Sequence, residues 1–186
     1  MRRGFKSEAR AIAGEVRGEL GLHPTDPLNP SALAQHLSIP VIPLSRLHGC
    51  EVAASYFRTV EPEVFSAVTV FEGRHRTIVH NDAHALVRQH SNISHELAHG
   101  LLNHSPKPAL DEFGCRYWDG EIEDEANFLG AALLVTPEAA LAVVRRNAPV
   151  DVAADAYGVS EALMTWMIND SGARIRVARE RARRTR

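Results

Sequence analysis

Two helical segments with the spacing of metal ligands constrain this chain more than any other feature. The first reads H-E-x-x-H over residues 95–99, inside a helical pattern. His95 and His99 lie one helical turn apart, so both imidazoles project from one face and can bind a single Zn²⁺. Glu96 is then placed to accept a proton from a water on the metal. A stripe of apolar residues at helical spacing anchors this helix: Ile93, Leu97 and Leu101.

An acidic segment about two dozen residues later offers the third ligand that a catalytic zinc site needs. This segment holds Glu121, Glu123, Asp124 and Glu125 at the start of a second helical pattern. On a helix, Glu121 and Glu125 lie roughly 200° from Glu123, so only one of these faces can meet the metal. Glu123 shares its face with Asn127, one turn further on. We predict Glu123 as the ligand and Asn127 as a group that orients a ligand, while the other acids favour the positive helix start.

Periodicity and turn residues predict the remaining elements. Helices are expected at 8–20, 30–37, 82–103, 121–135, 137–146, 150–157 and 160–168. Strands are expected at 53–57, 65–71 and 76–80, the last two joined as a hairpin by the turn 72–74. Residues 38–44, interrupted by Pro40 and Pro43, predict an edge strand or an extended loop. Residues 107–120 predict a loop.

Residues 88–104 and 121–140, which contain the two metal motifs, resemble the ImmA/IrrE metallo-endopeptidases, zinc proteins of the gluzincin type. Residues 65–82 are a softer match. The resemblance implies that His95, His99 and Glu123 bind the metal and that Glu96 is the general base. It also implies a protein substrate, a helix-turn-helix repressor or antitoxin cut at a specific site, in transcription regulation or a stress response.

We therefore expect an α+β, zincin-like metalloprotease domain, with a small mixed sheet packed on the H-E-x-x-H helix and a helical C-terminal part. Residues 1–147 form this domain together with N-terminal helices. Residues 148–173 form a helical hairpin packed on the same domain, and residues 174–186 form a basic tail.

The expected activity is peptide-bond hydrolysis with one Zn²⁺ per chain, although Mn²⁺ or Fe²⁺ can occupy such a site. Tyr117 is a candidate for stabilising the oxyanion, from its position alone. The substrate is expected to lie as an extended strand near residues 65–71. The alternative function is a zinc-containing transcriptional regulator or antitoxin-type binding protein that does not cleave, because the same ligands would hold a structural metal.

A different class of function is suggested by residues 150–168, which resemble a helix-turn-helix with Ser160 as the cap of its second helix. No Lys or Arg occurs between Asn147 and Ala173, which argues against direct DNA binding. We expect instead that the hairpin packs apolar side chains onto the core: Val152, Leu163, Trp166 and Met167. The tail has a charge of +6, which leaves −8 for the rest of the chain, and we expect a frayed, solvated helix end.

Several side chains have less specific expectations. Cys50 and Cys115 are far apart in the sequence, so we expect both to be free thiols. We expect His104 to cap the C-terminal end of the H-E-x-x-H helix. We expect exposed polar roles for three further histidines: His80, His84 and His90. The N-terminus has no apolar signal segment and no apolar run has the length of a membrane span, so we expect a cytoplasmic protein with no membrane partner.

Overall fold

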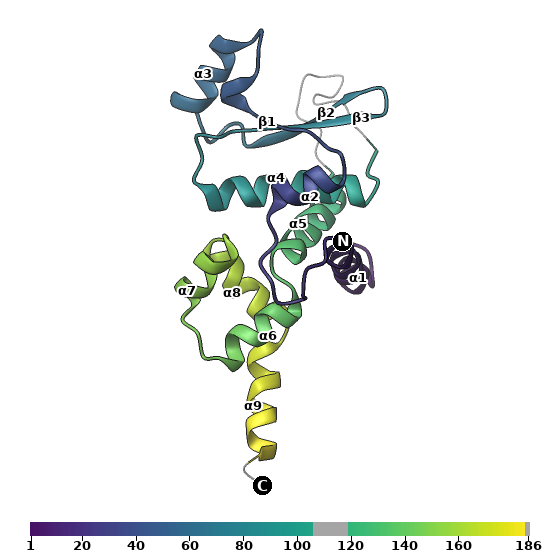
Figure 1. Ribbon diagram of the computed structural model, residues 1–186, viewed down its shortest axis with the longest axis vertical. Coiled ribbons are helices and arrows are strands. Elements are labelled where there is room, and N and C mark those ends of the chain that lie inside the picture. Colours follow the sequence, from purple (N-terminus) through teal and green to yellow (C-terminus); the bar gives the residue numbers. More distant parts are fainter. Residues whose placement is uncertain (106–118, 185–186) are drawn as a thin grey trace.

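A small mixed sheet lies between two helices in the computed structural model, which describes residues 1–105 and 119–184 (Figure 1). Its strands are β1 (Val41–Pro43), β2 (Ala67–Glu72) and β3 (His75–His80). Their order is β1-β3-β2, with β1 parallel and β2 antiparallel to the central strand β3. Helix α3 (Glu51–Thr59) lies over one end of one face of the sheet, and α4 (Leu86–Leu101), which carries the H-E-x-x-H motif, covers the other face.

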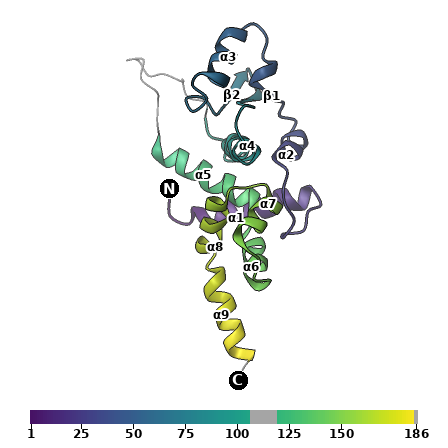
Figure 2. The ribbon, with the colours of Figure 1, turned by 90° about the vertical axis from the view of Figure 1, so that its left-hand side faces the viewer.

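The other helices complete the fold. They are α1 (Phe5–Glu19), α2 (Pro30–His36), α5 (Gly120–Leu134), α6 (Pro137–Arg145), α7 (Val150–Tyr157), α8 (Glu161–Asp170) and α9 (Ala173–Arg184); a short 3₁₀ turn, η1 (Leu44–Arg46), follows β1. Figure 2 views α4 nearly end-on, with α5 crossing beneath it. The mixed sheet and the helices confirm the expected α+β, zincin-like fold.

Helix α5 is the centre of the core. Its side chains from Phe128 to Leu134 are buried, and Leu129 and Leu133 have no exposed surface. Arg17 of α1, only 1% exposed, closes the C-terminal end of α5 by donating hydrogen bonds to the carbonyls of Leu133 (2.8 Å) and Leu134 (3.3 Å). These bonds satisfy carbonyl groups that every helix end leaves without partners, so α1 fixes the end of α5.

The hairpin β2–β3 places alternate side chains of β2 toward α4. Thr69 lies opposite Ile78 in the register, and Ile78 is buried in the main core beside Ile93 and Leu97 of α4. Val68 and Val70 alternate with Thr69, so their side chains point to the opposite face of the sheet, and they are 41% and 50% exposed. In the described part of the chain, no strand pairs with the outer edge of β2.

The predicted strand at 53–57 is wrong, because these residues belong to helix α3. Ala53 and Ala54 favour a helix, and Ala54 packs inward with Phe57 while Val52 is 88% exposed. A short apolar run does not distinguish a helix from a strand by its pattern. The predicted β2–β3 hairpin and the edge strand within 38–44 are confirmed.

The C-terminal hairpin packs differently from the expectation. Met167 is 1% exposed as predicted, but Val152 is 57% exposed and Trp166 is 42% exposed. The Trp166 ring still packs edge-on against the Phe128 ring, with 5.8 Å between the ring centroids. The buried positions are instead Ala153, Ala154, Val159, Met164 and Ile168.

The basic segment is a helix anchored to the body, rather than a frayed end. Ala173 and Val177 of α9 are buried, and Glu180 forms a bidentate ion pair with Arg145 of α6 (2.7 and 3.0 Å). Beyond this anchor α9 projects from the molecule (Figures 1 and 2).

Two histidines expected at the surface are buried. His80 is 6% exposed and His84 8% exposed, and a ring nitrogen of His84 bonds to the carbonyl of Pro62 (2.8 Å). Cys50 is a free, half-buried thiol as predicted, and Cys115 lies outside the described residues. Among the described helices, none is by itself long and apolar enough to cross a membrane. One bent pair, α5 with α6, has the required length and apolar composition when the two helices are taken together.

Candidate metal centre

Helices α4 and α5 cross at a point where a glycine lets their backbones approach closely. A Cβ atom on Gly130 would lie 3.2 Å from the Cα and N atoms of His95 and from the carbonyl carbon of Ser94. Glycine is therefore the residue that permits this separation. Glu123 and Asn127 lie on the same face of α5 as Gly130, so the close crossing brings both over the histidines of α4.

Three candidate ligand atoms converge at this crossing. The Nε2 atoms of His95 and His99 are 3.0 Å apart. Glu123 Oε2 lies 3.2 Å from His95 Nε2, and Glu123 Oε1 lies 3.7 Å from His99 Nε2. In the described part of the chain, this is the one group of three such side chains that could share a metal ion.

The spacing and chemistry of this group fit Zn²⁺. Tetrahedral zinc binds nitrogen and oxygen at about 2.0–2.1 Å, which places neighbouring ligand atoms about 3.3 Å apart. The two nitrogens are 3.0 Å apart, and the distances of 3.2 and 3.7 Å from them to the two oxygens of Glu123 lie near this value. The three side chains are 21–24% exposed, so one side of the group is open to a further ligand or a substrate. Two imidazoles and one carboxylate form a donor set that catalytic zinc accepts.

Each histidine has a partner for its second ring nitrogen. His95 Nδ1 lies 3.0 Å from Asn127 Oδ1, the amide predicted to orient a ligand. His99 Nδ1 lies 2.9 Å from Nδ1 of His104. Burial, reinforced by the neighbouring His95 and His104 rings, lowers the pKa of His99 to about 4, so this ring is neutral at pH 7. A neutral imidazole is the form that binds metal.

Glu96 lies between the histidines and the sheet. The hydroxyl of Thr69 on β2 donates a 2.5 Å hydrogen bond to Glu96 Oε2. Burial raises the pKa of the Glu96 carboxyl, while the bond from Thr69 and the nearby His95 oppose the shift. The sheet thus holds the predicted general base from one side, with Oε2 occupied.

Thr69 was not predicted as a site residue, and His104 has a different contact from the predicted one. Thr69 lies 27 residues before Glu96, and only the alternation of β2 signals that its side chain faces α4. His104 was expected to cap the helix, but its ring bonds to His99. Tyr117, the candidate for oxyanion stabilisation, lies outside the described residues.

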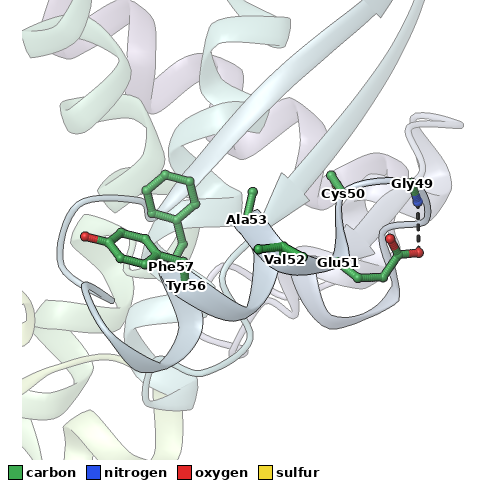
Figure 3. A pocket seen from close by; sticks show the side chains of 7 residues that line it. All are labelled: Gly49, Cys50, Glu51, Val52, Ala53, Tyr56 and Phe57. Atoms are coloured by element: carbon green, nitrogen blue, oxygen red, sulfur yellow. Dashed lines mark hydrogen bonds between the residues drawn. The ribbon is translucent and has the colours of Figure 1, made fainter.

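A separate apolar hollow of about 560 Å³ lies at α3, on the far side of the sheet from α4 (Figure 3). The segment from Gly49 to Phe57 lines it, and Val52 and Tyr56 are exposed there. Its carboxylate, Glu51, accepts a 3.0 Å hydrogen bond from the backbone N–H of Gly49. The hollow contains none of the converging donors of the metal centre.

The fold and this centre together define a class of protein. A helix with H-E-x-x-H beneath a small sheet, joined by a carboxylate from the next core helix, is the arrangement of a zincin-like metallopeptidase.

A comparison of sequences gives the family. The family model of the IrrE N-terminal-like domain, Peptidase_M78, matches residues 48–168, from the turn before α3 into α8. The chain therefore belongs to this metallopeptidase family, as the resemblance of its motifs to ImmA/IrrE proteins predicted. No curated protein and no solved structure shows a significant match to the chain.

Proposed function

We propose that the protein is a zinc-dependent endopeptidase with His95, His99 and Glu123 as its metal ligands. The observation that carries this proposal is the convergence of one donor atom from each of these side chains, all within 4.8 Å of one another, next to the half-buried Glu96. Zn²⁺ in this position would polarise the scissile carbonyl and lower the pKa of water toward neutrality.

Glu96 moves the proton in this mechanism. Thr69 binds Oε2, so Oε1 is the oxygen that remains to take a proton from the attacking water. The protonated carboxyl then delivers this proton to the leaving amine, which would otherwise depart as an unstable anion. Asn127 contributes by holding the ring of His95 through its amide oxygen, which fixes the orientation of that ligand.

The edge of β2 supports a mode of substrate binding. Thr69 of β2 touches Glu96, so this strand borders the catalytic residues, and its outer edge pairs with no other strand in the described residues. A peptide in extended conformation would add to this edge by main-chain hydrogen bonds, with side-chain pockets selecting the sequence.

Proline substitutions one at a time at Ala67 and Phe71 test this mode. The N–H of Asn81 bonds to the carbonyl of Ser66, and the alternation of an antiparallel ladder then turns the N–H groups of Ala67 and Phe71 away from β3. At positions whose N–H points outward, proline removes a bond to the substrate but none to β3, so zinc and folding should persist while cleavage falls. Full cleavage by every variant that folds would place the substrate elsewhere.

The proposed substrate class is a helix-turn-helix repressor or antitoxin in the cytoplasm. Membership of the Peptidase_M78 family and the resemblance of both metal motifs to ImmA/IrrE proteins support this assignment. Cleavage at one exposed, extended segment of such a regulator would inactivate it and change transcription.

The test compares the wild type with Glu96→Gln, which preserves the shape of the side chain but cannot accept a proton. Both zinc-loaded proteins are incubated with a proteome-derived peptide library and with full-length helix-turn-helix regulators, and new termini are identified by mass spectrometry. We expect specific new termini with the wild type alone, and equal zinc in both proteins. The same termini with Glu96→Gln would remove Glu96 from the mechanism. Tight binding of a regulator without any cleavage would favour the non-proteolytic alternative.

A further inference from the structure

The C-terminal end of α4 turns back so that His104 lies against a predicted metal ligand. Asn103 adopts a left-handed conformation (φ +54°), and the backbone N–H of His104 bonds to the carbonyl of His99 (3.0 Å). The N–H of Asn103 bonds to the carbonyl of Gly100 (3.1 Å), which completes the Schellman motif. In a Schellman motif, the residue after the left-handed position usually makes an apolar contact with a residue in the last turn of the helix. Here these two positions are His104 and His99. An imidazole pair replaces that contact.

The pair has a defined direction of hydrogen bonding. His99 Nε2 faces Glu123 and His95, so metal binding there leaves the proton of the ring on Nδ1. His99 Nδ1–H then donates to His104 Nδ1 at 2.9 Å. His104 must carry its own proton on Nε2, on the side where Glu125 Oε2 lies 3.9 Å away.

Glu125 is itself held in place from the N-terminal segment. It is 8% exposed, and its Oε1 accepts hydrogen bonds of 3.2 Å from both the backbone N–H and the side-chain Nε of Arg2. A continuous chain of polar contacts therefore leads from Arg2 through Glu125 and His104 to His99. The Glu125 carboxylate within this chain favours a proton on Nε2 of His104, which leaves Nδ1 free to accept from His99.

We propose that His104 is a positioning residue that fixes the tautomer and orientation of His99, with Glu125 holding His104. This inference rests on the proposed metal site and deepens it. It assigns to His104 the task that the amide of Asn127 performs for His95. Partners of this kind change metal affinity by about 10–100-fold when they are removed.

Two substitutions separate this role from a structural one. His104→Leu removes the acceptor but supplies the apolar contact that a Schellman motif ordinarily makes, so the helix end should stay folded. His104→Asn supplies an amide oxygen as an alternative acceptor, as Asn127 does. His36→Leu is the matched control, because His36 lies on α2 and pairs with Glu19 at the surface.

The experiment measures zinc affinity by competition with a chelator for the four proteins, together with thermal unfolding of the metal-free forms. We expect His104→Leu to bind zinc about 10–100-fold more weakly, His104→Asn to recover most of the loss, and His36→Leu to match the wild type. In zinc-loaded wild type, ¹⁵N NMR should show the His99 proton on Nδ1.

The outcomes separate this inference from the proposed function. A wild type that binds no stoichiometric zinc would contradict the metal site itself. Wild-type affinity in His104→Leu, with zinc bound normally by the wild type, would contradict only the role of His104. If His104→Leu does not fold, failure of a folded His104→Asn to bind zinc more tightly than a folded His104→Ala, which has no acceptor at this position, would also overturn it.

Discussion

At the scale of single residues, two carboxylates on one helix perform different tasks. Glu123 faces the histidines, whereas Glu125 faces His104 and Arg2. Residues two apart on a helix point roughly 200° from each other, which explains the separation. The helical period predicted that Glu123 and Glu125 face apart, and in the structure Glu123 is the carboxylate beside His95 and His99. The partners of Glu125 were not predictable, because Arg2 lies 123 residues away.

Thr69→Val should impair catalysis without releasing the metal. Valine matches the shape of threonine but cannot donate the 2.5 Å hydrogen bond to Glu96 Oε2. A hydrogen bond to a charged group contributes about 1.5–3 kcal/mol, and we expect kcat/KM for a cleavable peptide to fall about tenfold or more. Steady-state kinetics and metal analysis of the same preparation check both parts.

Thr77→Val is the control for this prediction. Thr77 precedes Ile78 on β3, so its side chain lies on the opposite face of the sheet from Thr69. Its loss should leave kcat/KM unchanged. If the two substitutions lowered kcat/KM equally, the effect would come from a general disturbance of the hairpin and not from loss of the hydrogen bond to Glu96.

At the scale of elements, strong local patterns predicted the helices and the hairpin, but contacts between elements were beyond the sequence. The alternation of β2 and the turn at Gly73 define the hairpin, and the apolar stripe around Leu97 defines α4. The short apolar run at 53–57 was compatible with either a strand or a helix, and its alanines favour the helix that forms. The reversal at Asn103, which brings His104 to His99, depends on one left-handed residue that periodicity does not report.

Gly130→Ala should separate α4 from α5 and weaken the metal site. The added Cβ would lie 3.2 Å from backbone atoms of His95, and backbone cannot move aside as a side chain can. Overpacking of this kind costs about 1–3 kcal/mol of unfolding free energy, more than the gain in helix propensity. Zinc affinity should fall in parallel, since α5 carries Glu123 and Asn127. Denaturant unfolding and chelator competition measure the two effects.

Gly14→Ala on α1 provides the opposite expectation. A Cβ at this position meets no atom within 4 Å, so the substitution should stabilise the protein by roughly 0.5–1 kcal/mol through helix propensity alone. Zinc affinity should not change. A Gly130→Ala variant that gains as much stability as Gly14→Ala, with unaltered zinc binding, would contradict the role of the crossing.

At the scale of the whole molecule, charge and chemistry lie at opposite ends. Helix α9 carries six arginines and one glutamate in its described residues, and it projects on the far side from α4 and the sheet (Figure 1). Exposed charges separated by more than a Debye length, about 10 Å at 0.1 M salt, are largely screened. The basic helix should therefore leave the metal centre unaffected.

Deletion of residues 178–186 should keep zinc content and peptide cleavage at the wild-type level. It removes five arginines and Glu180 but retains the buried Val177. Retention on heparin should fall, because a net charge of +4 is lost. A longer deletion that begins at residue 174 should in addition lower stability by about 1.5–3 kcal/mol, since it removes Val177. Loss of zinc in the shorter deletion would show that α9 supports the metal centre.

Metal content tests the central claim of a zinc site built by His95, His99 and Glu123 most directly. Wild type, Glu123→Ala and Asp124→Ala are purified identically and analysed for zinc by mass spectrometry. Asp124 is the neighbouring carboxylate, and its side chain is 67% exposed, which makes it a matched control. We expect about one zinc per chain in the wild type and in Asp124→Ala, and substoichiometric zinc in Glu123→Ala. Full zinc in Glu123→Ala, retained even when His99→Ala is added, would contradict this account of the site.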